Sequence, residues 1–240
     1  MLSERQIQLL QAIINDYIEN AEPVGSVEIV KKHNFRCSPA TVRNEMAKLI
    51  DLGFLEMLHT SSGRIPTKMA YRLYLEELME ENELPVLQEV AMKQRLWGNR
   101  FQLEKLLRET ALSIAENTKL LSIATTNDGF VTNAGAVNVL DNREFWDIDV
   151  AKSALILLDS YELLDKVFQT APFGEDVRCV IEEEIGLEKL NKCAVVFAGY
   201  NTGKIGGYVA VLGPSRMNYS KVIPTLRYAK NLLEELGGAW

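Results

Sequence analysis

Three short helix-forming segments, followed by a strand–turn–strand pattern, occupy the first 67 residues, and this order leaves few folds open. The first segment begins at Ser3, which forms a helix-capping pattern with Gln6 three residues later. Apolar residues then recur at spacings of three and four as far as Asn20, which predicts one buried helix face. A short second helix is expected to be capped by Ser26 and to end near Asn34.

The third segment is the most informative about function. Ser38 followed by Pro39 is typical of an N-cap and a first helical residue, and Gly53 supplies a left-handed stop. Apolar side chains gather on one side of this helix. The other side carries Thr41, Arg43, Asn44, Ala47 and Lys48. A face of hydroxyl, guanidinium, amide and ammonium groups, with an alanine that permits close approach, suits the major groove of DNA.

A hairpin is expected next, with a strand over 54–59, a polar turn and a returning strand over 65–67. Pro66 cannot donate to a ladder and therefore belongs on an edge. Three helices followed by such a hairpin form the winged variant of the helix-turn-helix, in which Arg64 at the hairpin tip would reach phosphates or the minor groove. The same order also serves in protein-binding modules, and a polar helix face is often simply solvated, so the pattern alone leaves both interpretations open.

The charge is unevenly distributed along the chain. The formal net charge is −7, yet residues 1–75 hold nine Lys/Arg against eight Asp/Glu, whereas the remainder holds 17 against 25. Within residues 31–48 there are five basic residues and one acid. The front of the chain therefore offers a basic surface compatible with nucleic acid, and an acidic body follows it.

The body predicts an α+β fold, in which one antiparallel sheet is flanked by helices. The expected elements are helices over 86–117 with a break near 98–99, a hairpin over 120–139, a helix over 144–169, strands at 177–181, 194–198 and 208–212, and a closing helix from about 220. We divide the chain into a winged helix-turn-helix (1–75), a linker with connecting helices (76–117) and a sheet domain (118–240).

Several blocks of sequence resemble one known family. In the first third these blocks are Glu22–Ser26, Ser38–Met46, His59–Thr67 and Tyr71–Arg72. They closely resemble the N-terminus of the HrcA family of heat-inducible transcription repressors, with Ser62 as a small departure from an expected alanine. In the body, Glu183–Gly186 and Gly207–Tyr219 resemble the family's C-terminal signature, which implies a GAF-like domain.

Two departures from the family pattern matter. The family's glycine before the paired acids is Glu182 here. Family members are also longer and carry a dimerising module inserted in the GAF-like domain. In this chain Val139–Asp141 leads almost directly to Glu144, so that module is expected to be missing or reduced, and dimerisation by that route is in doubt.

The resemblance implies a repressor of chaperone operons that binds an inverted repeat in double-stranded DNA as a homodimer and is released on heat stress. The chaperonin GroEL is an implied partner, and direct thermal unfolding of the body is the competing sensor. The residues expected to contact DNA are Ser38, Thr41, Arg43, Asn44 and Lys48 on the third helix, with His59, Arg64 and Lys68 on or after the hairpin.

Other kinds of chemistry have little support. No apolar run approaches the roughly 18 residues of a membrane span, and the N-terminus is too polar for a secretion signal. The three cysteines form no CxxC, which favours reduced thiols and a cytoplasmic location. We expect no metal, no cofactor and no enzymatic activity, because no ligand spacing or nucleophile–base pair is evident.

Two features of the body are candidate binding sites. Residues 199–205 superficially resemble a phosphate loop, but the spacing is one residue short, so a hairpin turn is expected. Arg216 could bind an anion, although a turn-stabilising role is the simpler interpretation. A regulator gated by a small molecule in the GAF-like domain remains the alternative function, by analogy of fold alone.

Overall fold

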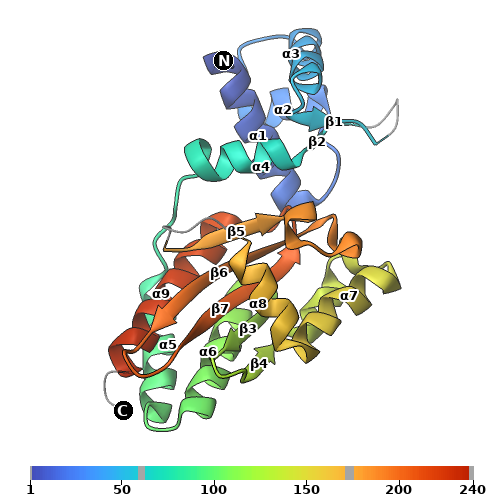
Figure 1. Ribbon diagram of the computed structural model, residues 1–240. Helices are drawn as coiled ribbons and strands as arrows, with labels where there is room; N and C mark the ends of the chain where they lie inside the picture. Colours follow the sequence, from blue (N-terminus) through green and yellow to red (C-terminus); the bar gives the residue numbers. More distant parts are fainter. Residues whose placement is uncertain (1, 59–62, 171–175, 238–240) are drawn as a thin grey trace. The chain divides into compact units, whose positions relative to one another are not determined.

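The computed structural model describes residues 2–58, 63–170 and 176–237. The chain forms two compact units, Met1–Glu80 and Glu81–Trp240, and each is described by itself (Figure 1).

The first unit has the order of a winged helix-turn-helix. Its elements are α1 (Glu4–Asn20), α2 (Ser26–His33), α3 (Pro39–Asp51), β1 (Leu55–Glu56), β2 (Ile65–Pro66), α4 (Lys68–Leu73) and a π-helical turn η1 (Tyr74–Leu78). The antiparallel pair β1–β2 is the predicted hairpin, although the first strand is shorter than expected. The core of this unit is formed by fully buried side chains of the three helices, among them Ile13, Ile29 and Leu49.

The caps explain where these helices begin and end. The capping box is confirmed: the Ser3 hydroxyl accepts from the backbone N–H of Gln6, whose side chain accepts from the Ser3 N–H. The prediction that Ser26 caps α2 is wrong, because Gly25 holds the extended N-cap position and Ser26 is the first helical residue. Asn34 ends α2 in the left-handed conformation, as predicted.

The second unit is built on a five-stranded antiparallel sheet of order β4-β3-β7-β6-β5. Its elements are α5 (Val86–Asn99), α6 (Leu103–Thr118), β3 (Leu121–Thr125), β4 (Val131–Ala134), η2 (Ala136–Asp141), η3 (Arg143–Phe145), α7 (Ile148–Asp159), α8 (Tyr161–Gln169), β5 (Arg178–Ile181), η4 (Glu182–Ile185), η5 (Glu188–Leu190), β6 (Cys193–Asn201), β7 (Gly206–Pro214) and α9 (Tyr219–Gly237).

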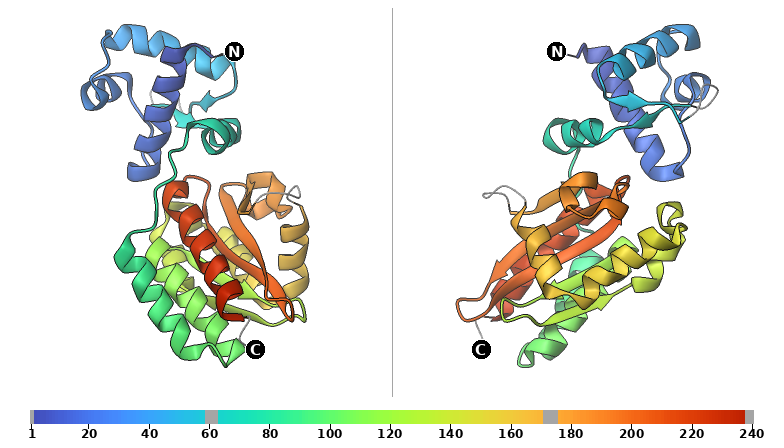
Figure 2. Two further views of the ribbon diagram at one scale, coloured as in Figure 1. Left: turned by 90° about the vertical axis from the view of Figure 1, so that its left-hand side faces the viewer. Right: turned by 45° about the vertical axis from the view of Figure 1, so that its right-hand side comes forward.

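Helices cover both faces of this sheet. Helices α6 and α9 lie on one face with α5 outside them, and α7 and α8 lie on the other (Figure 2). Successive strand residues point to opposite faces, so a strand between two helical layers must be apolar throughout. The central strands β6 and β7 are buried along almost their whole length, which satisfies this requirement. The expected α+β architecture with an antiparallel sheet and flanking helices is therefore confirmed.

The second unit differs from the sequence-based expectations in three places. The boundary between the units follows Glu80, and α6 packs directly on β3 and β4, so residues 81–117 belong to the body rather than to a linker. The helix expected over 144–169 is interrupted at Ser160, which is extended and caps α8. Strand β4 ends early because Gly135 adopts a left-handed φ of 72° and begins η2.

The junction expected to lack the inserted module is short. A single residue, Asn142, joins η2 to η3; its N–H donates to the Val139 carbonyl at 3.3 Å and its own carbonyl accepts from Phe145 at 3.0 Å. The other departure from the family pattern also has a structural meaning. Glu182 has a φ of 58°, a backbone conformation that favours glycine.

Candidate nucleic-acid interface

Helix α3 forms as its sequence predicts. The Ser38 hydroxyl caps it by accepting from the Thr41 N–H at 3.1 Å, Pro39 occupies the first turn, and Gly53 follows its end with a φ of 81°. The side chains of Val42 and Met46 are buried against the rest of the unit. The opposite face of the helix is therefore the one that can meet a partner.

The outward face of α3 presents the predicted polar side chains. Arg43, Asn44 and Lys48 are exposed, and Thr41 is half-buried. The Thr41 hydroxyl lies 3.0 Å from that of Ser38, and the Lys48 ammonium lies 3.2 Å from the Glu45 carboxylate. Within the described part of the chain, the side chains of Arg43 and Asn44 make no hydrogen bond or ion pair. Their guanidinium and amide groups can therefore take up an external partner without breaking an internal contact.

Glu45 anchors this helix, although it was not among the predicted site residues. Its side chain accepts from Arg5 at 2.6 Å, from the Gln6 amide at 3.1 Å and from Lys48 at 3.2 Å, and only 4% of the residue is exposed. Burial alone would raise the pKa of this carboxyl, but the hydrogen bonds from Arg5 and Lys48 hold it below its ordinary value. Glu45 shares the inward face of α3 with Val42 and Met46. An acidic residue on this apolar stripe was the sequence feature that could have indicated a buried, paired carboxylate.

A second buried carboxylate ties α1 to α2. Asp16 lies 2.6 Å from the Lys32 ammonium and 3.2 Å from the His33 ring. The hydrogen bonds that Lys32 donates to Asp16 and Glu19 raise the pKa of the ammonium, so it stays charged. The Asp16 and Glu45 contacts together orient the two helices of the helix-turn-helix on α1.

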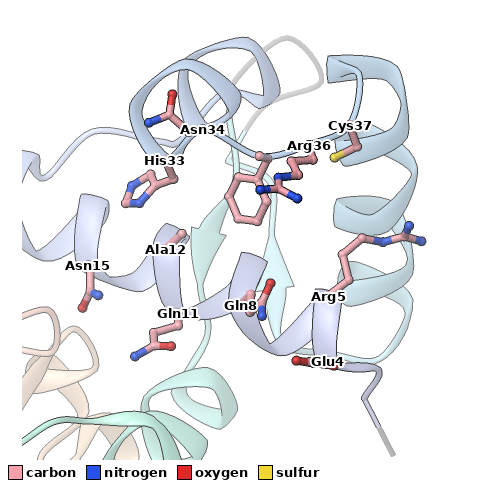
Figure 3. A pocket seen from close by; sticks show the side chains of 11 residues that line it. Glu4, Arg5, Gln8, Gln11, Ala12, Asn15, His33, Asn34, Arg36 and Cys37 are labelled. Carbon is pink, nitrogen blue, oxygen red and sulfur yellow. The ribbon is translucent and has the colours of Figure 1, made fainter.

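An open hollow of about 680 Å³ lies between α1 and the turn that joins α2 to α3. Figure 3 shows Arg5, His33, Arg36 and Cys37 around it, and the polar side chains of α1 form its floor. The Arg5 guanidinium is already engaged by Glu45.

The base of the wing is tied to the segment before α2. Val24 and Arg64 exchange two backbone hydrogen bonds of 2.9 Å. The prediction that Arg64 lies at the hairpin tip is wrong, because this pairing holds it at the base of the wing beside β2. A Cβ atom on Gly63 would lie 2.5 Å from the Pro23 backbone, so this close approach requires glycine. The residues beyond, including His59, lie outside the described part of the chain.

A groove of about 520 Å³ brings basic residues of three elements together. Its lining includes Lys31 of α2, Arg43 of α3 and Arg64 beside β2. Lys31 was not among the predicted contacts, although the excess of bases over 31–48 was the signal for it. Lys68 lies in the first turn of α4 and does not line this groove. The groove and the outward face of α3 form a continuous polar surface because Arg43 belongs to both.

Both candidate binding sites of the body, the β6–β7 turn and Arg216, have structural roles. Residues 201–206 form the β6–β7 turn, in which the Gly203 N–H donates to the Asn201 side chain at 2.8 Å. Arg216 makes a two-pronged ion pair with Glu144, at 2.7 and 3.1 Å. Over the described residues no cluster of three or more His, Cys, Asp or Glu side chains could hold a metal ion. No helix in these ranges is long and apolar enough to span a membrane.

Comparison with known families settles the relationship. The family model for the "Winged helix-turn-helix transcription repressor, HrcA DNA-binding" matches residues 1–80, and the model for the "HrcA protein C terminal domain" matches residues 55–223. The chain belongs to the HrcA family. The predicted resemblance is thereby confirmed, and the winged helix that carries Arg43 and Arg64 coincides with the region matched as DNA-binding.

Relatives of this HrcA-family chain extend over its whole length. It is 26% identical to the heat-inducible transcription repressor HrcA of Acetivibrio thermocellus, with 98% of the chain and 96% of the relative covered. It is 29% identical to the HrcA of Moorella thermoacetica, with 98% and 97% covered. Both alignments run over 336 or 337 positions, far more than the 240 residues of this chain, so the relatives carry residues that it lacks.

A solved structure has the same fold. A crystal structure described as a hypothetical protein superposes with a TM-score of 0.84 at 22% identity, covering 100% of this chain and 99% of the other. Nearly complete coverage of both chains shows that both contain a winged helix and a sheet domain of the same fold.

Proposed function

We propose that this HrcA-family protein is a heat-inducible transcription repressor that binds an inverted-repeat operator of chaperone genes in the cytoplasm. The observation that carries the proposal is the outward face of α3, where Arg43 and Asn44 are exposed and, within the described residues, make no hydrogen bond or ion pair. Arginine and asparagine make two-pronged contacts with guanine and adenine edges in the major groove. Because Glu45 anchors α3 on α1, the helix can present these groups without changing its own orientation.

The other proposed DNA contacts differ in whether their chemistry suits the base edges or the phosphate backbone. Thr41 and Lys48 extend the base-facing surface of α3, and Ser38 lies at its N-terminus, where backbone N–H groups favour a phosphate. Arg64 and Lys31 line the groove beside Arg43 and are placed to meet the DNA backbone. Lys68, and His59 at the wing, complete the proposed set. The protein acts by binding rather than by catalysis.

Two copies are required by an inverted repeat, since each half-site takes one winged helix. A single module of this size binds weakly at physiological salt, and a dimer gains both affinity and selectivity. We further propose that GroEL supports the repressor, so that unfolded protein, by occupying GroEL, relieves repression. Thermal opening of the body is the competing sensor. The ligand-gated alternative draws on the fold alone, and a fold hosts many functions.

Selection of duplexes from a random library by the native protein tests the proposal. An inverted repeat should be enriched, with at least about a thousandfold preference over random duplex at one fixed salt concentration. Enrichment of no sequence, or equal affinity for selected and random duplexes, would refute it. Adding GroEL at increasing temperature should extend operator binding to higher temperature; an unchanged midpoint would favour direct thermal opening.

Substitutions on the proposed surface sharpen this test. Arg43→Ala should cost about 1–3 kcal/mol on the selected operator and relax the preference at one base step. Lys68→Ala should weaken binding to all duplexes alike and lower the salt slope by about one. Arg108→Ala, which removes an exposed arginine from α6, is the matched control and should change neither. Equal losses on operator and random DNA for Arg43→Ala would contradict the assignment of that side chain.

A further inference from the structure

Helix α5 and the turn that follows it, at Phe101, carry an apolar stripe that faces away from the body. Leu87, Val90, Trp97 and Phe101, with Gln94 among them, follow spacings of three and four, the pattern of a helix that pairs with another helix. Leu87 is 85% exposed, Phe101 68% and Trp97 51%. Such large exposed apolar groups in a row mark an interaction surface rather than scattered surface residues.

The orientation of α5 is fixed by its inner side. Met92 and Leu96 are fully buried where α5 packs against α6 and α9. The Lys93 ammonium lies 3.0 Å from Glu235 of α9, and the Tyr228 hydroxyl donates to the Glu89 carbonyl at 3.1 Å. Rotation of α5 to bury its outer stripe would break these contacts. The stripe can therefore be covered only by something added from outside the second unit.

The stripe is contiguous at its C-terminal end. The Arg100 guanidinium lies 4.3 Å from the centre of the Trp97 ring and 4.2 Å from that of Phe101. Both rings therefore contact the same guanidinium and form one continuous aromatic patch. Gly98, beside Trp97, has no atom within 4 Å of the place where a Cβ would stand, so this position is open to an incoming side chain.

We propose that the occupant of this stripe is the α5 helix of a second copy of this chain, packed antiparallel about a two-fold axis at Gln94. In that register Trp97 of one copy lies opposite Ala91 of the other, and Val90 lies opposite Gly98. At these two levels a large side chain faces a small one, and Leu87 of each copy meets Phe101 of the other. A parallel arrangement would set Trp97 against Trp97 and Phe101 against Phe101, leaving the small residues unfilled. The antiparallel register is therefore the one that sets small residues opposite Trp97 and Val90, and it is compatible with the two-fold symmetry of an isologous interface.

Area and charge are compatible with this pairing. Since an aromatic side chain offers about 150–250 Å², the exposed parts of Trp97 and Phe101, with Leu87 and the neighbouring valines, amount to roughly 500 Å² per copy. Two copies would bury about 1,000 Å², the lower end for a specific interface. In this register Lys93 of one copy lies opposite Arg95 of the other. Each of these positive charges is already paired within its own chain, Lys93 with Glu235 at 3.0 Å and Arg95 with Glu116 at 2.9 Å.

The mass of the protein in solution, measured by light scattering without DNA, tests the pairing. Native protein should have twice the 27.0 kDa mass of one chain, and Trp97→Glu should raise the dissociation constant at least tenfold. Trp146→Glu is the matched control, because Trp146 is 68% exposed but lies between η3 and α7. It should leave the dimer intact. Both tryptophans are more than half exposed, so melting curves should show that both variants fold.

Each other outcome overturns the proposal. A native monomer would mean that no second copy covers the stripe, and that the chain's own winged-helix unit or another partner does so. Dissociation by Trp146→Glu but not by Trp97→Glu would place the dimer interface on the α7 side. As a positive test, Gln94→Cys in a Cys37→Ser background should form an intermolecular disulfide under mild oxidation, and Lys105→Cys should not. The pairing rests on the proposed need for a dimer. Because these experiments contain no DNA, the α5 pairing can fail without refuting the proposed operator binding.

Discussion

Replacement of Glu45 by glutamine tests how the DNA-facing helix is held. The carboxylate receives hydrogen bonds from Arg5, Lys48 and Gln6, whereas an amide presents one acceptor oxygen and turns its NH₂ group toward a donor. The side chains of Arg5 and Lys48 are 55% and 61% exposed, so solvent screens them and each contact is worth at most about 1 kcal/mol. Arg5 and Lys48 donate to one carboxylate oxygen and Gln6 to the other. The new amide therefore either turns its NH₂ toward the two cations or leaves the buried Gln6 amide without its acceptor, which costs about 1–3 kcal/mol. We expect Glu45→Gln to destabilise the first unit by about 1–2 kcal/mol.

Hydrogen exchange of the full chain, followed by mass spectrometry, measures this locally. Peptides of α1 and α3 should exchange about 5–30-fold faster in Glu45→Gln at neutral pH. Peptides of the sheet domain should be unchanged. Glu235→Gln is the control, because the pair that it breaks with Lys93 is exposed on both sides and should change exchange very little. Unchanged exchange in α1 and α3 would refute the anchoring role of Glu45.

The effect should also depend on pH in a definite direction. The folded-state pKa of Glu45 lies below its ordinary value of 4.5, so the unfolded chain binds the proton more readily. The stabilisation by this group is therefore fully present above about pH 4.5 and is lost as the pH falls through the folded-state pKa. The difference in exchange between native protein and Glu45→Gln should shrink in that acid range. A difference that stays constant there would show that the carboxylate charge is not its source.

Three further outcomes follow from the structure. Gly63→Ala should destabilise the base of the wing by about 1–3 kcal/mol, because the new Cβ would meet the Pro23 backbone at 2.5 Å. Thermal unfolding of the full chain should show a lower midpoint, and an unchanged midpoint would contradict this. Glu182→Gly should stabilise the body by about 0.5–1 kcal/mol by relieving a φ of 58°, measured as a shift in the denaturant midpoint; a lower midpoint would contradict it. Burial raises the pKa of Cys193 to about 12, so iodoacetamide at pH 8 should label at most the other two thiols in native protein and all three after unfolding.

Local sequence patterns determined much of the fold. The capping residues Ser3, Ser38 and Thr67 mark where α1, α3 and α4 begin, because a cap depends on a few neighbouring residues. The exposed positions of Arg43 and Asn44 also followed from helical periodicity alone. The family followed from short blocks of sequence in the right order, and the family models matched it.

Contacts between residues far apart in the chain required the tertiary structure. Glu45 meets Arg5 across 40 residues, and no local pattern states which buried acid finds which cation. The groove that joins Lys31, Arg43 and Arg64 exists only because the wing pairs with the segment before α2.

The boundary between the units was also decided by packing. The sequence over 76–117 predicts helices but not the surface on which they lie, because an amphipathic helix can bury its apolar face against any suitable neighbour. In the structure α6 finds that neighbour in β3 and β4, and α5 packs on α6 and α9. The outward stripe of α5 is what remains once these contacts are made. Helical periodicity thus determined which residues share a face, and only long-range packing decided which face is left for a partner.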